Sequence, residues 1–262
     1  MTAAGTVAIT GLGLWVPGFP TTAAWAAGTA DAEASKPIGT ALDRVNRRRA
    51  SPLDRALADT VAAAMQQAGV DVTTVPVVIG SSIGEAATMI GLLDEMWRHH
   101  TPMSPADFTM SVHNAASGLI SISNKNRGMT TSLAADHDTP AAALLEGIGL
   151  VLTQHAPVVV ACGDEPAPPT LVQHAPPWSM LTAAVVLAPF AEATPHLARL
   201  RVTLDEPATL PLDRFEPMLR NNPQIGLLGV VDAVLRRTAG VLPLDNGSGR
   251  GYRAVVAPGP AP

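Results

Sequence analysis

Short apolar runs alternate with longer amphipathic segments along most of the 262-residue chain. A continuous apolar run bounded by turn residues is typical of a strand that is buried on both faces. The runs predicted as strands are residues 7–10, 75–80, 130–135, 158–161, 180–187, 200–204 and 251–257. The segments with helical spacing are residues 53–68, 85–100, 114–123, 140–153 and 227–237. This alternation predicts an α/β fold with a mainly parallel sheet, in which edge strands can run the other way.

Small residues and proline mark the ends of these elements. Gly11 and Gly13 follow the first apolar run, so we expect that strand to end there in a tight turn. Ser51 and Pro52 predict a helix start, because serine caps a helix and proline is tolerated in its first turn. Gly69 predicts the end of the same helix. Near the N-terminus, Trp25 is expected to begin or cap a short helix.

The composition indicates a globular chain, some of whose apolar surface is expected to be hidden in an interface. Hydrophobic residues make up 47% of the sequence and charged residues 15%, which excludes a disordered chain and suggests an interface. The net charge of −5 provides no basic field, so neither nucleic acid nor an anionic membrane is expected as a partner. The lone Cys162 excludes an intramolecular disulfide, fits a reducing compartment and is expected to be a small buried hydrophobe.

No segment predicts a membrane span or an export signal. No apolar run reaches the ~18 residues that a bilayer requires, and no basic region precedes the first apolar run. His99 and His100 end a predicted helix without the cysteine or carboxylate spacing of a zinc site. We therefore expect a soluble cytoplasmic protein without a metal or a cofactor.

Six segments, in order along residues 7–190, resemble the β-ketoacyl synthases of the thiolase superfamily. The segments are residues 7–13 (opening strand and turn), 48–53 (start of the first core helix), 78–85 (second strand and turn), 104–118 (ending Asn114-Ala115-Ala116-Ser117-Gly118, like the family's stretch before the nucleophile), 127–128 (start of the strand to the nucleophile) and 158–165 (the following strand). The resemblance implies a thiolase-like αβαβα layered fold with a truncated C-terminal half. It implies a single ketosynthase-like domain over residues 1–262, with a thiolase-like half at 1–190 and a reduced half at 191–262.

The cysteine nucleophile of that family has no counterpart in this chain. It lies nine residues beyond the glycine that matches Gly128, and the count lands on His137. Glu146, nine residues further on, matches an acidic residue that is frequent in the family. A slip of one or two residues would not bring in a thiol, because the neighbours are Ala135, Asp136 and Asp138. Carbon–carbon bond formation in the family begins with the thiolate, so no catalytic residue is expected here.

The C-terminal half also lacks the histidines of the family. Residues 226–235 and 240–243 resemble the family's Gly-His-x-x-Gly-Ala-Ala-Gly helix and the Gly-x-x-Pro after it, and residues 249–256 resemble its closing loop and strand. On that alignment a catalytic histidine falls at Pro223, and the family's His-Gly-Thr-Gly loop has no match. In active enzymes these histidines donate hydrogen bonds to the developing enolate, which a proline side chain cannot do.

Several polar segments allow more than one interpretation. Residues 136–138 are either polar side chains at the nucleophile turn or the remnant of an acid–base site, and Asp138 with Thr139 also suits a helix cap. Residues 47–49, all arginine, are either a solvated surface segment or a contact for a phosphate or a carrier protein. Asp164 and Glu165 follow an apolar strand and are expected at the surface.

The resemblance also implies a subunit interface beside the nucleophile turn. Active family members dimerise by pairing the strand before the nucleophile, here residues 130–135, and this hides the strand's edge. In the family, the segment that matches residues 104–118 lines the contact near the partner's acyl tunnel, where apolar side chains can set the tunnel's length. The predicted tunnel and interface residues are Phe108, Met110, His113, Asn114, Thr131, Leu133, Ala135, Asp136, His137 and Asp138.

The most similar group is the short, ketosynthase-like chain-length factors of bacterial aryl polyene and type II polyketide pathways. The resemblance implies a noncatalytic subunit that forms a heterodimer with an active β-ketoacyl synthase and shapes its acyl tunnel, in polyketide or fatty-acid-like biosynthesis. The partner would supply the cysteine and histidines, and an acyl carrier protein would deliver the substrate. Two alternatives stay open: a stand-alone acyl-transfer or decarboxylating enzyme that uses His137, and a homodimeric acyl-binding scaffold.

Overall fold

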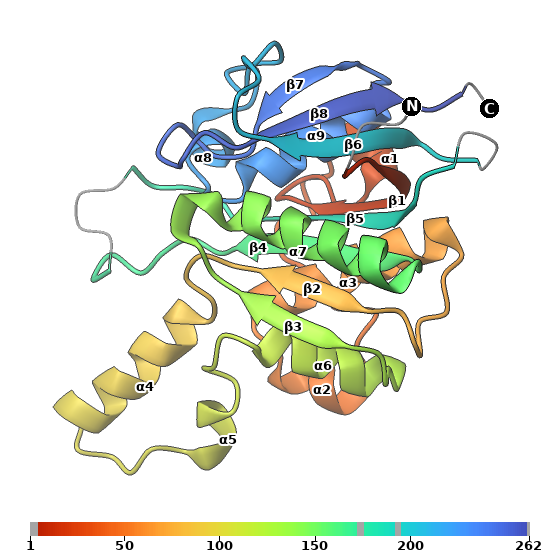
Figure 1. The fold of residues 1–262 in the computed structure, drawn as a ribbon. Helices are drawn as coiled ribbons and strands as arrows, with labels where there is room; N and C mark the ends of the chain where they lie inside the picture. The colour runs from red at the N-terminus through yellow and green to blue at the C-terminus, as the bar shows by residue number, and fades with distance from the viewer. Residues whose placement is uncertain (1–4, 172–175, 192–194, 261–262) are drawn as a thin grey trace.

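The computed structural model describes residues 5–171, 176–191 and 195–260, and the described strands form one mixed sheet (Figure 1). The strands are β1 (Val7–Trp15), β2 (Val77–Gly80), β3 (Thr130–Leu133), β4 (Val158–Asp164), β5 (Leu181–Pro189), β6 (Ala198–Thr203), β7 (Gly240–Pro243) and β8 (Arg253–Pro258). They lie in the order β3-β2-β4-β5-β1-β6-β8-β7. β7 was not predicted from the sequence pattern.

The strand directions correct the expectation of a mainly parallel sheet with exceptions at its edges. β1 to β4 run the same way, because β2 is parallel to β3 and β4, and β5 is antiparallel to both β4 and β1. All pairs from β4 to β7 across the sheet are antiparallel, so β5 and β6 run against β1 to β4 inside the sheet. No helix is described between β4 and β5 or between β5 and β6, and only a parallel pair requires a crossover.

β1 continues through Gly11 and Gly13 instead of ending there. Both glycines face α3 (Pro52–Ala68), where a Cβ at Gly11 would lie 2.2 Å from the Ala64 carbonyl oxygen and a Cβ at Gly13 would lie 2.0 Å from the Thr60 carbonyl oxygen. The prediction of a turn was therefore wrong. The glycines allow the helix to approach the sheet closely, a use of glycine that a sequence pattern does not separate from a turn.

Helices cover both faces of the sheet, as the pattern predicts. α3 and α6 (Ala115–Asn124) pack on the face that carries Val159, and α7 (Thr139–Gln154) and α9 (Ile225–Leu235) pack on the face that carries Val160. Neighbouring residues of one strand thus enter different cores, as strand geometry requires. The predicted limits of α3 are confirmed, because Ser51 caps the helix and Gly69 ends it in a left-handed conformation.

The C-terminal part of the sheet is small and depends on the N-terminal part for its core. β6 pairs with β1 only where Val7–Ile9 meets Ala198–Leu200, and β8 and β7 follow toward the edge. α8 (Pro217–Arg220) leads into α9, which contacts β1 and β5 as well as β7 and β8. All residues of α9 except Leu235 are buried, so this helix joins the two parts.

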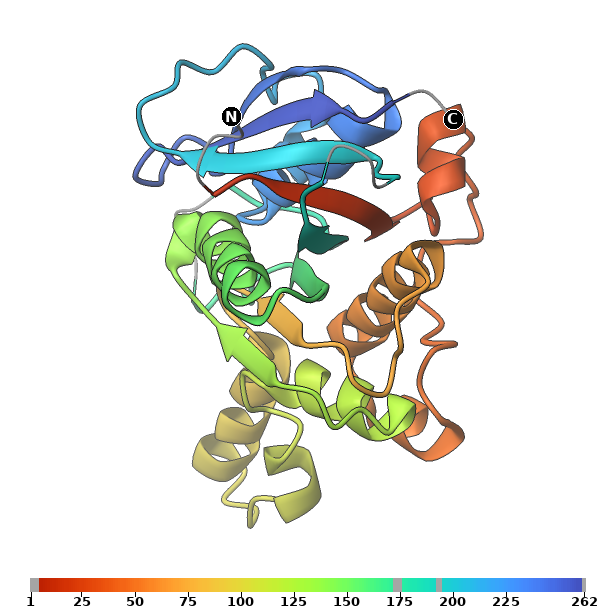
Figure 2. The same cartoon turned by 45° about the vertical axis from the view of Figure 1, so that its right-hand side comes forward.

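Two further helices form an arm that projects from the body of the molecule (Figures 1 and 2). They are α4 (Ala86–Arg98) and α5 (Pro105–Phe108), and in α4 only Ala86 and Leu92 are buried. Met89, Leu93, Met96 and Trp97 are exposed large apolar side chains that recur at helical spacing along α4.

Two short helices precede α3. α1 (Thr22–Ala27) is capped by Thr21, so Trp25 lies inside this helix and not at its start. α2 (Arg44–Arg49) occupies the polar segment before α3 and is capped by Asp43.

Candidate functional site

The chain turns sharply between β3 and α7, at the C-terminal edge of the parallel strands. This turn contains the short helix η1 (Asp136–Asp138), and Asp136 has a φ of 52°. A positive φ is uncommon for a residue other than glycine, and strained residues at strand-to-helix turns present nucleophiles in other enzyme classes. The strained position is thus one residue before His137. Neither position carries a thiol.

His137 is present at the turn but is not organised as a catalytic base. Its side chain is 29% exposed, and Nε2 lies 3.7 Å from Asp136 Oδ1, which is too long for a hydrogen bond. Its Nδ1 is buried and has no hydrogen-bond partner among the described residues. A general base needs a neighbour that orients the ring, and the described structure provides none.

Asp138 holds a C-terminal loop instead of capping α7. The residue occupies the N-cap position, but its side chain makes no capping hydrogen bond. Asp138 Oδ1 accepts a hydrogen bond from the Arg250 backbone N–H at 2.8 Å. Thr139 closes the turn, since its hydroxyl accepts from the Ala135 N–H at 2.9 Å and donates to the Asp136 carbonyl at 2.7 Å. Asp138 therefore occupies the expected cap position, but the expected side-chain cap is not formed, because the hydroxyl of Thr139 bonds to residues 135 and 136 before the helix.

A pocket of about 640 Å³ lies beside the turn. Ala135, Asp136 and Asp138 form one wall, and the loop that Asp138 holds forms another. The remaining lining side chains include Ala142 and Leu145 of α7. We call this cavity the elbow pocket.

Behind the turn, a fully buried carboxylate closes the ends of the strands. Asp164 is the last residue of β4 and accepts hydrogen bonds from Ser81 Oγ (2.5 Å), the Ser82 backbone N–H (3.0 Å) and Gln224 Nε2 (2.6 Å). Burial raises the pKa of Asp164, and the hydrogen bonds from Ser81 and Gln224 act against that rise. The expectation that Asp164 and Glu165 lie at the surface was wrong, because their exposed fractions are 0% and 7%.

Gln224 joins this carboxylate to the turn. It precedes α9 and also donates from Nε2 to Ser82 Oγ at 2.7 Å, and Ser82 Oγ in turn donates to the Asp136 carbonyl at 2.7 Å. Asn222 donates to the Asp164 carbonyl at 3.1 Å. Pro223, predicted to replace a catalytic histidine, lies between these two amides and is buried. This segment therefore brings amides to the site, and residues 221–229 contain no histidine.

A second group of buried acids lies where the arm leaves the body. Glu85 accepts hydrogen bonds from Ser51 Oγ (3.0 Å) and Thr88 Oγ1 (3.3 Å), and Asp54 accepts from the Ser51 backbone N–H (3.0 Å). Asp54 Oδ1 is buried and accepts nothing from the described N–H and hydroxyl groups. Burial and the charge of Asp54 raise the pKa of Glu85 to about 9, so a proton on Glu85 can satisfy Asp54. Burial also raises the pKa of Asp54, to about 6.

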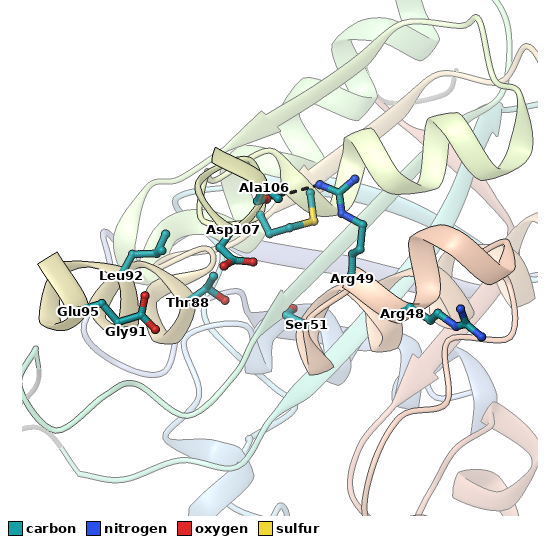
Figure 3. A pocket seen from close by; sticks show the side chains of 10 residues that line it. Arg48, Arg49, Ser51, Thr88, Gly91, Leu92, Glu95, Ala106 and Asp107 are labelled. Atoms are coloured by element: carbon teal, nitrogen blue, oxygen red, sulfur yellow. Dashed lines mark hydrogen bonds between the residues drawn. The ribbon is translucent and has the colours of Figure 1, made fainter. Parts of the chain in front are cut away.

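The arm encloses a separate pocket of about 570 Å³ (Figure 3). Met110 lines it together with Arg48, Arg49 and residues of α4. Figure 3 shows Arg49 reaching toward α5, where its guanidinium donates to the Ala106 carbonyl at 3.4 Å and to Thr109 Oγ1 at 3.1 Å. Met110 therefore faces this arm pocket and not the elbow pocket.

The remaining predicted residues divide between the turn and the arm. His113 Nε2 lies 2.8 Å from the Ser81 carbonyl oxygen and packs on Gly84, so it supports the loop under Asp164. Phe108 is 52% exposed, and Asn114 is exposed before α6. On β3, Thr130 and Ser132 bond to α6, which leaves the alternate residues Thr131 and Leu133 on the α7 side.

Neither a metal site nor a membrane-spanning helix is found in the part of the chain that the structure describes. Within residues 5–171, 176–191 and 195–260, no cluster of three or more His, Cys, Asp or Glu side chains could hold a metal ion. In the same part of the chain, no helix has both the length and the apolar character needed to cross a membrane. Cys162 is fully buried as expected, and burial together with the charge of Asp164 raises the pKa of its thiol.

The mixed sheet, its two helical faces and the strained strand-to-helix turn define a layered α/β protein of the thiolase-like class. The sequence model described as "Beta-ketoacyl synthase, N-terminal domain" matches residues 22–235, which is most of the chain. The chain therefore belongs to the β-ketoacyl synthase family. No curated protein sequence matches it significantly.

Solved structures confirm the fold class. A chain from the structure of the ketosynthase ApeO in complex with its chain length factor ApeC, from Xenorhabdus doucetiae, is 21% identical with a TM-score of 0.71, and the match covers 96% of this chain and 99% of that chain. A chain of the ishigamide ketosynthase/chain length factor is 18% identical with a TM-score of 0.61, covering 76% and 68%. A β-ketoacyl synthase from Burkholderia phymatum STM815 is 14% identical with a TM-score of 0.57, covering 82% and 70%.

Proposed function

We propose that the chain is the noncatalytic, chain-length-factor-like subunit of a heterodimer, in which an active β-ketoacyl synthase performs polyketide, aryl polyene-type or fatty-acid-like condensation. The chain would act as a single ketosynthase-like domain with a reduced C-terminal half, and it would work in the cytoplasm. The observation that carries the proposal is the turn at Asp136 and His137, which keeps the strained backbone of a nucleophile turn without a thiol.

The surroundings of the turn support a noncatalytic role. Asp164, Ser82 and Gln224 hydrogen-bond to one another where the segment before α9 meets the turn. The amide nitrogen of Gln224 donates to both Ser82 Oγ and Asp164. A decarboxylating site needs free donors directed at the developing enolate. His137 has no orienting neighbour, so the alternative of a stand-alone enzyme gains no support from its geometry.

The edge strand β3 supports a subunit contact. β3 pairs with β2 on one side only, so its other backbone edge is open to a partner strand. Large apolar side chains are exposed on the elements that flank it: Ile122 on α6, Met129 before β3, and Leu145 and Leu152 on α7. Leu145 and Leu152 are two turns apart and lie on the same side of α7. A partner that continues the sheet would cover all four.

The similarity to a chain of the ApeO–ApeC structure, a ketosynthase in complex with its chain length factor, supports a subunit role. The match covers almost all of this chain and almost all of the chain it is compared with. We infer that this chain acts as the chain length factor of a comparable complex.

The elbow pocket would extend the acyl tunnel of the partner. Leu145 lines the pocket and belongs to the exposed apolar side of α7, so the pocket opens beside the proposed contact. Its Ala135 and Ala142 leave room for a growing chain. Ala142→Phe would fill that room, and we expect shorter products from the complex, whereas Ala142→Ser should leave product length unchanged.

The arginines of α2 would contact the acyl carrier protein. Arg44 and Arg48 are exposed on α2, which also carries Arg47 and Arg49. Arg55 follows in α3. Carrier proteins are acidic, and a basic patch mainly speeds the encounter with an acidic partner. Arg44→Glu combined with Arg48→Glu should raise the KM for carrier-bound substrate about tenfold at low salt, and Arg199→Glu on β6 is the matched control.

Co-expression with the active ketosynthase of the same cell tests the proposal. We expect a 1:1 complex in which Leu145→Arg combined with Leu152→Arg weakens association at least ~100-fold, while Leu204→Arg, another exposed leucine, does not. Identical activity and products of the ketosynthase with and without this chain would contradict the proposal. A stable homodimer that ignores the ketosynthase would favour the acyl-binding scaffold instead.

A further inference from the structure

A third cavity lies away from β3, on the side of the molecule where β1, α1 and the end of α9 meet. It has a volume of about 620 Å³, within the range of small-molecule sites. Phe19, Trp25 and Phe215 line it, although the whole chain contains only nine Phe, Trp and Tyr residues. Three of the nine aromatic side chains of the protein therefore meet at this one cavity.

The three rings are held by contacts with one another. Trp25 stacks on Phe215 at a centroid distance of 6.1 Å and an interplanar angle of 25°, and Phe19 meets Trp25 edge-on at 5.2 Å. The indole N–H of Trp25 donates to Asp232 Oδ1 at 2.8 Å, which fixes the ring. The rings thus form a preformed apolar wall.

Two arginines share one buried carboxylate at this wall. Asp232 is 1% exposed, and its two oxygens lie 2.6 Å from an Arg214 terminal nitrogen and 2.9 Å from Arg236 Nε. Arg214 also lies over the Phe215 ring, 5.1 Å from its centroid. The carboxylate therefore positions both guanidinium groups against the aromatic wall.

Most of the donor capacity of these guanidinium groups is unused. Each guanidinium has five N–H donors, and the described residues engage only one nitrogen of each. Glu216 also lines the cavity, but it is exposed and forms no ion pair with either arginine. The buried anion is shared by both arginines, and the exposed Glu216 is screened by solvent, so the unused N–H donors of the arginines are available to a ligand anion. The planar fork of arginine suits a carboxylate.

We propose that this cavity binds a small aromatic monocarboxylate, with its ring against Trp25 and Phe215 and its carboxylate on Arg214 and Arg236. The site is independent of the nucleophile turn and of the proposed subunit contact. It would therefore bind its ligand whether or not the chain acts as a chain-length factor.

Calorimetric titration of the full chain tests the site with three probes: benzoate, cyclohexanecarboxylate and benzyl alcohol. We expect benzoate to bind with a Kd below about 1 mM, and the other two at least ~10-fold more weakly, because each lacks either the aromatic face or the charge. Absence of benzoate binding up to about 10 mM, or equal binding of all three probes, would overturn the proposal.

Matched variants test the arginine. Arg236→Met should lower benzoate affinity at least ~10-fold. Arg98→Met is the control, since Arg98 forms the same type of i,i+4 pair with Asp94 on the distant α4. Equal affinity in both variants would refute the role of Arg236.

A measurement on the unmodified chain removes any dependence on the variants' folding. Of the indole N–H resonances of Trp15, Trp25, Trp97 and Trp178, only that of Trp25 should shift on addition of benzoate, because only Trp25 lines the cavity. Trp25→Phe assigns that resonance. A benzoate-dependent shift at the other tryptophans with none at Trp25 would contradict the site.

Discussion

Replacing Glu85 with glutamine should make the protein more stable at alkaline pH, although it removes a buried hydrogen-bonding acid. Glu85 is 3% exposed, accepts from Ser51 Oγ and Thr88 Oγ1, and has no cation paired with it among the described residues. Glutamine has the same shape. Its amide N–H can donate to Asp54 permanently, whereas glutamic acid donates only while it is protonated.

The size of the effect follows from the raised pKa of Glu85. The pKa is about 9 in the folded chain against an ordinary value of 4.5. Between these values the folded state holds one proton that the unfolded state has lost. The stability from this group is therefore complete below pH 4.5 and falls by about 1.4 kcal/mol per pH unit as the pH rises toward 9. From pH 6 to pH 8 the loss is about 3 kcal/mol.

Urea unfolding at several pH values between 5 and 9 measures this difference. The free energy of unfolding of Glu85→Gln should fall less steeply with pH than that of the wild type, by about one proton per molecule. Glu95→Gln on the same helix, where the glutamate is exposed, controls for loss of a carboxylate. Parallel pH profiles for the wild type and Glu85→Gln would show that Glu85 is ionised in the folded chain and would refute the reasoning.

Three further predictions concern the core and the buried network. Gly13→Ala should lower the free energy of unfolding by at least about 2 kcal/mol, because the new Cβ would lie 2.0 Å from the Thr60 carbonyl oxygen. Gly91→Ala is the control, since a Cβ there meets open space, and urea titration compares the stabilities of the two variants. Gln224→Leu should cost about 1–3 kcal/mol in the same assay, since it removes a donor from buried Asp164, and an effect no larger than that of exposed Gln66→Leu would contradict this. Cys162 should resist iodoacetamide until the chain unfolds, because it is fully buried and its pKa is raised; rapid native labelling would count against the described core.

The layered architecture could be predicted because most helices and strands have strong patterns of their own. Ser51 and Gly69 mark the two ends of α3, and continuous apolar runs such as β4 predict strands covered on both faces. Strand direction could not be predicted in the same way. Whether β5 is antiparallel to β4 depends on the connection between them. A continuous apolar run predicts a buried strand but not its direction in the sheet. The close approach of α3 at Gly11 and Gly13 likewise depends on a neighbour distant in sequence.

The candidate site could be predicted only along β3 and the turn that follows. The count from Gly128 reaches the turn within one residue of the strained Asp136. The sequence predicts Asp164 at the surface, because an acid after a strand usually lies there, whereas the structure buries it. Its donors come from segments near residues 82 and 224, and no local pattern links these segments. The available signal for a buried carboxylate was the pair Asp164-Glu165, which comes at the end of the apolar run of β4.

A condensation assay with a malonyl thioester and an acyl primer tests the central claim most directly. The purified chain alone should form no carbon–carbon bond, because neither Asp136 nor His137 can take up an acyl group as a thioester. The purified complex with its ketosynthase should extend the primer to a defined length. Omitting this chain should give a longer or mixed set of products, and Ala142→Phe in its elbow pocket should give shorter ones. Extension of the primer by the chain alone would contradict the account.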